Sequence, residues 1–252
     1  MPPPRTLVQD VAFCVIFFTR LPLPRLDLEG IKLARAIWAA PLAGLIVALL
    51  AGLVYACAIA VGLSTGPAAA LAVTTTMLTT FCLHEDGFSD TADGFGGGAT
   101  LDRKLEIMHD SRIGSYGSAA FLVSVLLRWS ALAAIGAPSS VVVALIAAHM
   151  ASRGLLPAFM HITPLARQAG LAAVAGKPSR EVAIVAALLG LAGLLLLGLS
   201  TALIAIIILA ICFFGFRHLC MKQIGGQTGD TLGALQQIAE IAIFLIASAT
   251  LS

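Results

Sequence analysis

Seven acidic residues are concentrated in one short part of this chain. They lie between positions 85 and 110 and make up more than half of its thirteen acids. They are Glu85, Asp86, Asp90, Asp93, Asp102, Glu106 and Asp110. An uncharged apolar run, residues 67–83, comes directly before this group. Ionisable side chains at the edge of such a run are candidates for function.

Three of these carboxylates are spaced as metal ligands would be on a helix. If the preceding helix continues, Asp86, Asp90 and Asp93 share one face at positions i, i+4 and i+7. Carboxylates so placed repel one another, and a bound divalent cation removes that repulsion. Oxygen ligands without a Cys or His cage favour Mg²⁺, with Mn²⁺ as the alternative. We therefore predict a metal site at these three residues, with Asp110 as a further ligand.

A catalytic carboxylate is expected in the same group. Asp86 and Glu85 are the candidates, because either could orient or deprotonate a hydroxyl group of a substrate. His84 is a further candidate base, although a histidine at the end of a helix often has only a structural role.

Glycines and an arginine follow the acids. Gly96, Gly97 and Gly98 would let the backbone approach a bulky anion and present its N–H groups to it. Ser111 and Arg112 come after them, and the forked donors of arginine bind two phosphate oxygens at once. We expect all five residues to bind substrate and Arg112 to assist catalysis as well. Together with the metal site, they indicate phosphoryl or nucleotidyl transfer.

A second glycine-rich stretch, GGQTGDTLGALQQ, occupies residues 225–237. Gly225, Gly226, Thr228 and Asp230 are candidate substrate ligands, and Asp230 could also join the metal site. The alternative is that Thr228 or Asp230 simply caps the last helix.

Three further arginines lie in or near apolar segments. Arg20 would either bind phosphate or anchor the chain to lipid head groups. Arg153 is a candidate ligand for an anionic substrate, together with His149. Arg128 is expected to pair with Glu240, because each is a lone charge within an apolar span.

The composition places these groups in an integral membrane protein. The chain has 252 residues, of which 59% are hydrophobic and only 11% charged, whereas soluble domains carry roughly 25% charged residues. We predict an all-α helical bundle with about seven transmembrane helices. The predicted spans are residues 37–63, 67–83, 117–137, 139–160, two within 182–216 separated by a turn at 198–201, and 231–251. A net charge of +2 argues against nucleic-acid binding.

The positive charges suggest how the bundle is oriented. Lys and Arg accumulate in cytoplasmic loops, and seven spans with a cytoplasmic N-terminus place every charged loop on that side. We therefore expect one catalytic domain over residues 1–252, with an interfacial segment at 1–36 and cytoplasmic active-site loops at 84–116 and 217–230. An amphipathic helix is predicted within residues 7–24, and no cleaved signal peptide is expected. The five cysteines suggest small apolar residues and not a disulfide framework or a zinc site.

Several stretches together resemble the cobalamin-5′-phosphate synthases, which are also called adenosylcobinamide-GDP ribazoletransferases. The matching stretches are FFTRLP (17–22), HEDGFSDTADGFGGG (84–98), EIMHDSRIGSYG (106–117), ASRGLLP (151–157) and GGQTGDTLGALQQ (225–237). They occur in the expected order over nearly the whole chain.

The resemblance implies a late step in the assembly of vitamin B12. The enzyme would join adenosylcobinamide-GDP to α-ribazole, or to its 5′-phosphate, and release GMP. It would require Mg²⁺ and would lie in the bacterial inner membrane with its active site facing the cytoplasm. Its partners would be these two substrates and the lipid bilayer, with a homo-oligomer or an association with other late cobalamin-assembly enzymes as further possibilities.

Other classes of membrane protein fit less well. DTADG at residues 90–94 is similar to the opening of the CDP-alcohol phosphotransferase motif, but the rest of that motif is missing. Aspartate-rich prenyltransferases use two acidic motifs, whereas the second stretch here has only Asp230. A transporter would carry polar residues along its mid-membrane faces, whereas most charges here lie at one surface.

Overall fold

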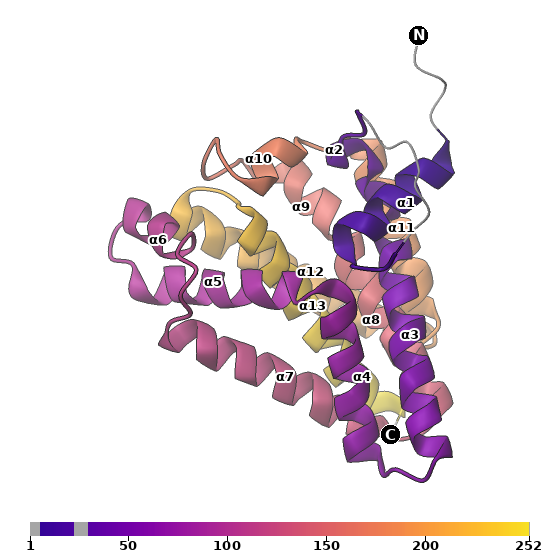
Figure 1. Cartoon of the computed structure of the whole chain (residues 1–252). Helices are drawn as coiled ribbons and strands as arrows, with labels where there is room; N and C mark the ends of the chain where they lie inside the picture. The colour runs from indigo at the N-terminus through magenta and orange to yellow at the C-terminus, as the bar shows by residue number, and fades with distance from the viewer. Residues whose placement is uncertain (1–5, 23–29, 252) are drawn as a thin grey trace.

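The computed structural model describes residues 6–22 and 30–251. Within this part of the chain the elements are all helices, and the only β-type pairing is an isolated bridge between Leu165 and Gln227. The predicted all-α class is therefore confirmed (Figure 1).

The helices vary widely in length. In chain order they are α1 (Leu7–Phe18), α2 (Leu33–Ala36), the 3-10 helix η1 (Ile37–Ala39), α3 (Ala40–Ala60), α4 (Thr65–Thr80), α5 (Leu83–Gly97), α6 (Leu101–Ile107), α7 (Ser115–Ile135), α8 (Pro138–Gly154), α9 (Leu156–Ile162), α10 (Leu171–Ala175), α11 (Arg180–Leu195), α12 (Leu199–Ile224) and α13 (Gly229–Leu251).

Five helical segments of the described chain are long and apolar enough to cross a membrane. They are Leu33–Ala60, Ser115–Ile135, Pro138–Ile162, Leu199–Ile224 and Gly229–Leu251. A sixth is possible if α4 and α5 count as one broken span. The apolar run at 182–216 is divided by a turn, as predicted, and Gly198 adopts a positive φ of 87° there. The turn occupies residues 196–198 and not the predicted 198–201, because α12 already begins at Leu199. The protein is thus a multi-pass membrane protein, while the count of seven and the orientation remain predictions.

The sequence suggested that the helix before the acidic group continues through it. The structure shows that it does not. Phe81 and Cys82 both have left-handed backbone angles, with φ of 57° and 55°. Non-glycine residues adopt this conformation at a cost of about 1–2 kcal/mol each. The chain turns by 88° here, so α5 runs across the bundle beside α7 (Figure 1). Because α5 carries four carboxylates in 15 residues, we treat it as lying outside the membrane-spanning segments.

Two glycines let α5 and α13 approach closely. A Cβ atom on Gly87 would lie 2.8 Å from the carbonyl oxygen of Asp230, and a Cβ on Gly233 would lie 3.3 Å from the Cα of Gly87. A methyl group does not fit at Gly87 without a shift of the backbone and would be tightly packed at Gly233, as in other close contacts between membrane helices. The close approach brings the acidic residues of α5 beside the first turn of α13.

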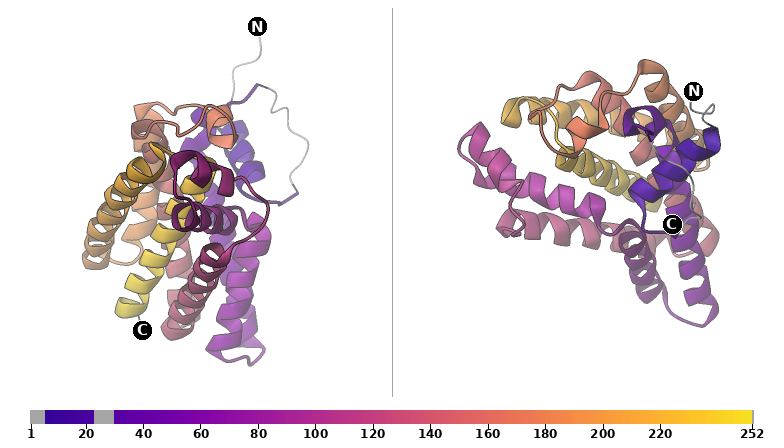
Figure 2. Two further views of the ribbon diagram at one scale, coloured as in Figure 1. Left: turned by 90° about the vertical axis from the view of Figure 1, so that its left-hand side faces the viewer. Right: turned by 45° about the horizontal axis from the view of Figure 1, so that its top comes forward.

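The N-terminal helix packs against the bundle. The indole Nε1 of Trp38 donates a hydrogen bond to a carboxylate oxygen of the buried Asp10, at 3.0 Å. A helix was predicted within residues 7–24, and the structure has α1 at Leu7–Phe18, packed against α3 (Figure 2). Pro24 lies outside the described residues.

Both predicted active-site loops are largely helical. The segment 84–116 contains most of α5 and all of α6, and the segment 217–230 is mostly the end of α12. The glycines suggested loops because glycine disfavours helices, but here they lie where helices or loops pack closely. Only short connections remain, and they meet at one end of the bundle.

Candidate active site

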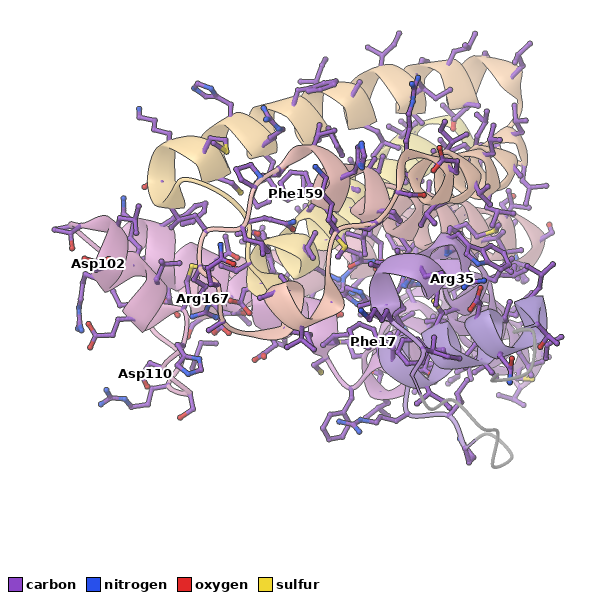
Figure 3. All side chains as sticks on the ribbon, turned by 90° about the horizontal axis from the view of Figure 1, so that it is seen from above. Phe17, Arg35, Asp102, Asp110, Phe159 and Arg167 are labelled. Atoms are coloured by element: carbon purple, nitrogen blue, oxygen red, sulfur yellow. The ribbon has the colours of Figure 1, made fainter. Side chains whose placement is uncertain are left out.

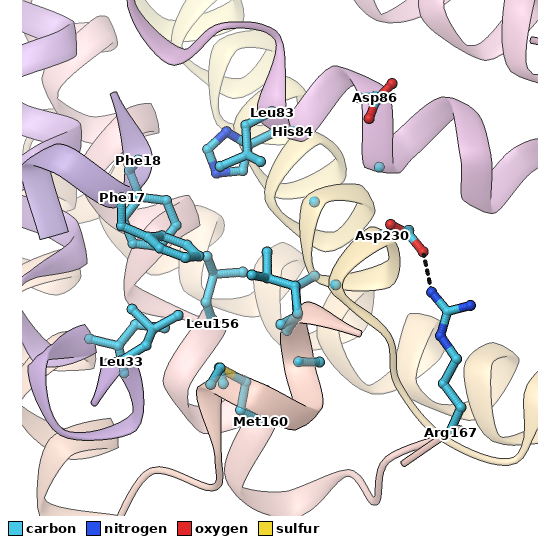
Figure 4. A pocket seen from close by; sticks show the side chains of 18 residues that line it. Phe17, Phe18, Leu33, Leu83, His84, Asp86, Leu156, Met160, Arg167 and Asp230 are labelled. Carbon is cyan, nitrogen blue, oxygen red and sulfur yellow. Dashed lines mark ion pairs between the residues drawn. The ribbon is translucent and has the colours of Figure 1, made fainter. Parts of the chain in front are cut away.

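Two cavities of different character meet between α5 and the start of α13. The apolar cavity has a volume of about 240 Å³ and is lined by residues of α1, α2, η1, α5, α9, α10 and α13. The polar cavity has a volume of about 440 Å³ and contains Asp90, His109 and Asp110. Asp86, Arg167 and Asp230 line both cavities, of which Figure 4 shows the apolar one. A substrate spanning the two cavities would therefore pass these three side chains.

The acidic residues at this junction come from two helices. Asp86 and Asp90 are one turn apart on α5, and Asp230 is in the first turn of α13. Burial, followed by the charges of Asp86, Asp230 and Asp93, raises the pKa of Asp90 from its usual 3.8 to about 7. The carboxylates therefore repel one another, which a bound cation would relieve.

A short pairing of two loops positions Arg167 and Asp230. The amide of Ala166 donates to the carbonyl of Gln227 at 2.9 Å, and the amide of Gln227 donates to the carbonyl of Pro164 at 2.8 Å. Arg167 follows this pairing directly and lies 3.8 Å from the Asp230 carboxylate. Thr228 accepts a hydrogen bond from the amide of Thr231 and so caps α13, which is one of the two alternatives that the sequence left open.

Asp93 has a structural contact where a metal ligand was predicted. Its two carboxylate oxygens accept hydrogen bonds from the amides of Gly114 and Gly117, at 2.6 and 2.8 Å. These amides belong to the N-terminus of α7, whose positive end favours a carboxylate. Asp93 is buried and lines neither cavity, so we reassign it from the metal site to a cap of α7.

The remaining carboxylates fit magnesium by their chemistry. Asp86, Asp90 and Asp230 offer only oxygen atoms at a polar cavity, which suits a hard cation that keeps several water ligands. Among the described residues, no three His, Cys, Asp or Glu side chains are already gathered closely enough to hold a metal ion. The donor set is therefore suitable, but the protein side chains do not form a closed cage.

Asp110 and Arg112 contact each other at the edge of the polar cavity. The guanidinium of Arg112 donates to both carboxylate oxygens of Asp110, at 2.7 Å for the shortest contact. These hydrogen bonds lower the pKa of Asp110 to about 2. Asp110 and Ser111 line the polar cavity, whereas the side chain of Arg112 is 86% exposed and lines neither cavity. Arg167 lies near them (Figure 3) and is the arginine that lines both cavities.

The predicted glycine cradle does not form. Gly96 and Gly97 are in the last turn of α5 and Gly98 is its C-cap, and the C-terminal end of a helix repels anions. The side chains of Tyr116, Ile107 and Lys104 respectively fill the space beside them.

The glycines of the second stretch are likewise structural. Gly225 ends α12 with a positive φ of 71°, where glycine is favoured. Gly226 packs against the backbone of residues 164–166, so its role is to allow the pairing of the two loops.

Glu85 belongs to a buried network and does not line either cavity. Its carboxylate lies 2.8 Å from Arg128, and the same nitrogen of Arg128 lies 3.3 Å from Glu240. The predicted pair of Arg128 and Glu240 is thus confirmed, with Glu85 as an unexpected second partner. All three side chains are at most 2% exposed. Glu85 therefore has no access to a substrate hydroxyl in this structure.

Arg153 and His149 are part of the same network. They lie 3.7 and 3.0 Å from the Glu240 carboxylate and are both 1% exposed. Gln236 also donates to Glu240, at 2.5 Å. Neither Arg153 nor His149 lines the two cavities, so their predicted contact with an anionic substrate has no support in this structure.

Arg20 contacts the strained turn. Its guanidinium lies 4.7 Å above the ring of Phe81, and its amide donates to the carbonyl of Thr79 at 2.8 Å. Arg20 lines neither cavity and is positioned to hold the break between α4 and α5. His84, in contrast, lines the apolar cavity and stacks on Phe18 with ring centroids 5.8 Å apart.

The sequence is similar to those of known proteins over almost the full chain. Residues 10–248 match the family described as cobalamin-5-phosphate synthase. The chain belongs to this family. An adenosylcobinamide-GDP ribazoletransferase of Mesorhizobium japonicum is 57% identical over 99% of this chain and 96% of its own. Proteins of the same name from Bradyrhizobium diazoefficiens and Shewanella pealeana are 50% and 41% identical, over 97% and 91% of this chain and 95% and 91% of theirs. No solved structure matches the chain.

Arg167 was not among the residues predicted from the sequence to act in the site. It lies in the segment TPLARQAG, outside every motif that indicated the family. Its only signal was a positive charge in a loop after a predicted span. The loop pairing that places it against Asp230 joins residues more than 60 positions apart, so it could not be inferred from local sequence.

Proposed function

We propose that the chain transfers the cobinamide phosphate of adenosylcobinamide-GDP to a ribose hydroxyl of α-ribazole or its 5′-phosphate, with release of GMP. The observation that supports this proposal is the junction of an apolar and a polar cavity at Asp86, Arg167 and Asp230. Such a junction suits a reaction between a nucleoside carrying an apolar base and a charged diphosphate. The names of the family and of its relatives favour these two substrates over others.

In the proposed reaction the ribose oxygen bonds to the phosphorus on the cobinamide side. The bond from that phosphorus to the bridging oxygen breaks, and GMP leaves with the electron pair. Asp86 is the carboxylate best placed to accept the proton of the hydroxyl, because it lies where the two cavities meet. Arg167 would bind the non-bridging oxygens of the diphosphate through its forked donors. Glu85 has no part in this scheme, because it is bound to Arg128.

We propose that Asp90 and Asp230, together with Asp86, hold Mg²⁺. The ion would neutralise the charge that builds on the departing phosphate oxygens. The two helices that carry the three carboxylates are kept close by Gly87 and Gly233. The protein thus supplies few ligands and leaves room for phosphate oxygens and water, as magnesium sites usually do.

We further propose that the protein lies in the inner membrane of a bacterium, with this site facing the cytoplasm. Basic residues near the site, among them Arg103, Lys104, Arg167 and Lys222, favour that side. Lys104 of α6 donates to Gln223 at the end of α12, so these positive charges lie at the same end of the bundle.

The decisive experiment follows GMP release by the purified protein. With adenosylcobinamide-GDP, α-ribazole and Mg²⁺, we expect steady release that stops when a chelator is added and resumes with excess Mg²⁺. Absence of GMP in the complete mixture would contradict the proposed transfer, whereas release that persists in the chelator would contradict only the magnesium requirement.

A further inference from the structure

A groove on the outside of the bundle has no part in the candidate active site. Its volume is about 360 Å³, and it is lined only by Ala, Gly, Leu, Ile and Phe residues from the region of α8 and α9 and from α11 and α12. None of them lines the two cavities at Asp86. α8, α9 and α12 belong to segments long and apolar enough to cross a membrane. In the bilayer, this groove therefore opens towards acyl chains and not towards water.

Small residues on α8 and α11 form one wall of the groove. A Cβ atom on Gly154 of α8 would lie 2.8 Å from the carbonyl oxygen of Ala186 and 3.2 Å from the Cα of Gly190, both on α11. These two helices therefore pack closely. The opposite wall is α12, which is held to α9 by an edge-to-face contact of Phe159 with Phe213, with ring centroids 5.5 Å apart.

An arginine lies directly beyond one end of the groove. On α12 the lining residues Ala210 and Phe213 share one helix face, and Arg217 continues that face one turn later. The Nη2 atom of Arg217 donates a hydrogen bond to the carbonyl oxygen of Ile162 at 3.1 Å. Ile162 in turn is one turn beyond the lining residue Ala158 on α9. Both helices thus place Arg217 at the same end of the groove.

This end of the groove carries a net positive charge. Arg217 forms no ion pair with any residue that the structure describes. Its Nε is buried and its Nη2 binds a backbone carbonyl, which leaves Nη1 as the nitrogen that can contact a ligand. Arg180 lies two turns before the lining residue Ala187 on α11 and so extends the same face. The acid beside it, Glu181, is hydrogen-bonded to Ser179.

The length of the groove matches one half of a bilayer. From the lining residue Ile206 to Arg217, α12 rises by about 16 Å. One leaflet of the hydrocarbon core is about 15 Å thick. An acyl chain lying in the groove would therefore bring its head group to the level of Arg217.

We propose that the groove binds one anionic phospholipid, with an acyl chain between α11 and α12 and its phosphate at Arg217. Basic residues between membrane helices recognise anionic head groups, and arginine suits phosphate oxygens because of its forked donors. The inference is independent of the proposed transfer, because the groove shares no residue with the two cavities.

The test measures lipid binding to the purified full chain. The delipidated protein in detergent is titrated with phosphatidylglycerol, or with phosphatidylcholine of the same acyl chains, and native mass spectrometry gives the Kd of the first bound lipid. The wild type should bind phosphatidylglycerol at least about fivefold more tightly. Arg217→Gln should bind the two lipids equally, whereas Arg217→Lys keeps the charge and should retain the preference. Arg103→Gln removes an exposed positive charge outside the groove and should behave as wild type.

A second variant tests the groove itself and remains informative if Arg217→Gln does not fold. Ala210 is exposed and lines the groove, so Ala210→Phe should occupy the space of the acyl chain without crowding the core. Binding of both lipids should weaken by at least about tenfold. The control is Ile211→Phe, because Ile211 is 67% exposed and does not line the groove. It should bind both lipids as the wild type does.

The outcomes distinguish a lipid from other occupants. Loss of the preference in Arg217→Gln alone, or weaker binding of both lipids in Ala210→Phe but not in Ile211→Phe, supports the site whether or not GMP is released. Equal affinity of the wild type for the two lipids overturns the inference, as does an unchanged preference in Arg217→Gln. An altered oligomeric mass of Ala210→Phe with unchanged lipid binding would show that a second copy of the chain occupies the groove, which also overturns it.

Discussion

At the scale of single residues, Asp86 has the position expected of the group that accepts the proton of the substrate hydroxyl. It lies at the junction of the cavities, whereas the neighbouring Glu85 points into a buried ion-pair network. We predict that Asp86→Asn keeps the size of the side chain, removes the proton acceptor and lowers kcat by about 10²–10⁴-fold. GMP release under saturating substrates measures this.

The control for Asp86→Asn is Asp102→Asn. Asp102 is exposed on α6 and lines neither cavity, so its amide variant should turn over at the wild-type rate. Equal rates for all three proteins would show that Asp86 is not the proton acceptor.

The raised pKa of Asp90 allows a prediction of how pH affects the stability of the metal-free protein. Its folded pKa is raised to about 7 from 3.8, so the folded state favours the protonated form. The contribution of Asp90 to the free energy of unfolding is then most favourable below about pH 4 and is lost as the pH rises through 7. We predict that Mg²⁺ raises the Tm more at pH 8 than at pH 5.5. At pH 8 Asp90 is ionised, so it repels the neighbouring carboxylates and can bind the cation that relieves this repulsion.

Thermal unfolding of the detergent-solubilised protein with and without Mg²⁺ gives this difference. Asp90→Asn serves as the comparison, because it cannot ionise and should show a Mg²⁺ effect that varies little with pH. A wild-type Mg²⁺ effect that is the same at both pH values would contradict the assignment of Asp90 to the metal site.

At the scale of elements, the site depends on how closely α5 approaches α13. A methyl group on Gly87 would lie 2.8 Å from the carbonyl oxygen of Asp230, which is closer than real Cβ contacts. We predict that Gly87→Ala separates the two helices, moves Asp86 away from Asp230 and lowers activity by at least about tenfold. Gly97→Ala in the same helix meets only a side-chain atom at 3.5 Å and should remain active. Similar activity in both variants would contradict this role of the contact.

The buried ion-pair network leads to a second prediction at the scale of elements, which concerns the stability of the helix packing. Arg128 of α7 bridges Glu85 of α5 and Glu240 of α13. Removing one member of such a group leaves an uncompensated charge and costs about 3–5 kcal/mol. We predict this loss in the unfolding free energy of Arg128→Met, measured in detergent, with partial recovery in Arg128→Met/Glu85→Met. A single variant as stable as wild type would show that the network does not hold the helices together.

The elements also show which features the sequence could predict. The pairing of Arg128 with Glu240 was predictable because each was a lone charge in an apolar span. The break at Phe81 and Cys82 was not, because neither residue is a glycine or proline and the residue that contacts the turn, Arg20, is some 60 positions away in the sequence. This single turn changes the partner of Glu85 and the role of Asp93. Asp86 and Asp90 were predicted to lie near each other because they share a helix. The sequence left several roles open for Asp230, and the structure places it at the same cavity.

At the scale of the whole molecule, the charge distribution predicts orientation. Two exposed positions lie in connections of different charge: Asp102 on α6 beside Arg103 and Lys104, and Ser64 in the uncharged turn between α3 and α4. In a cysteine-free background, we predict that a membrane-impermeant maleimide labels Asp102→Cys in inside-out vesicles but not in intact spheroplasts. Ser64→Cys should show the reverse, because basic residues stay on the cytoplasmic side.

A permeant maleimide should label both variants in either preparation, which establishes that both cysteines are accessible to reagent. Labelling of both from the same side would mean that α4 does not cross the bilayer between these two connections. Labelling of Asp102→Cys only in spheroplasts would place the acidic site on the outer face, where it would be separated from substrates made in the cytoplasm. The proposed transfer therefore depends on this orientation as much as on the carboxylates themselves.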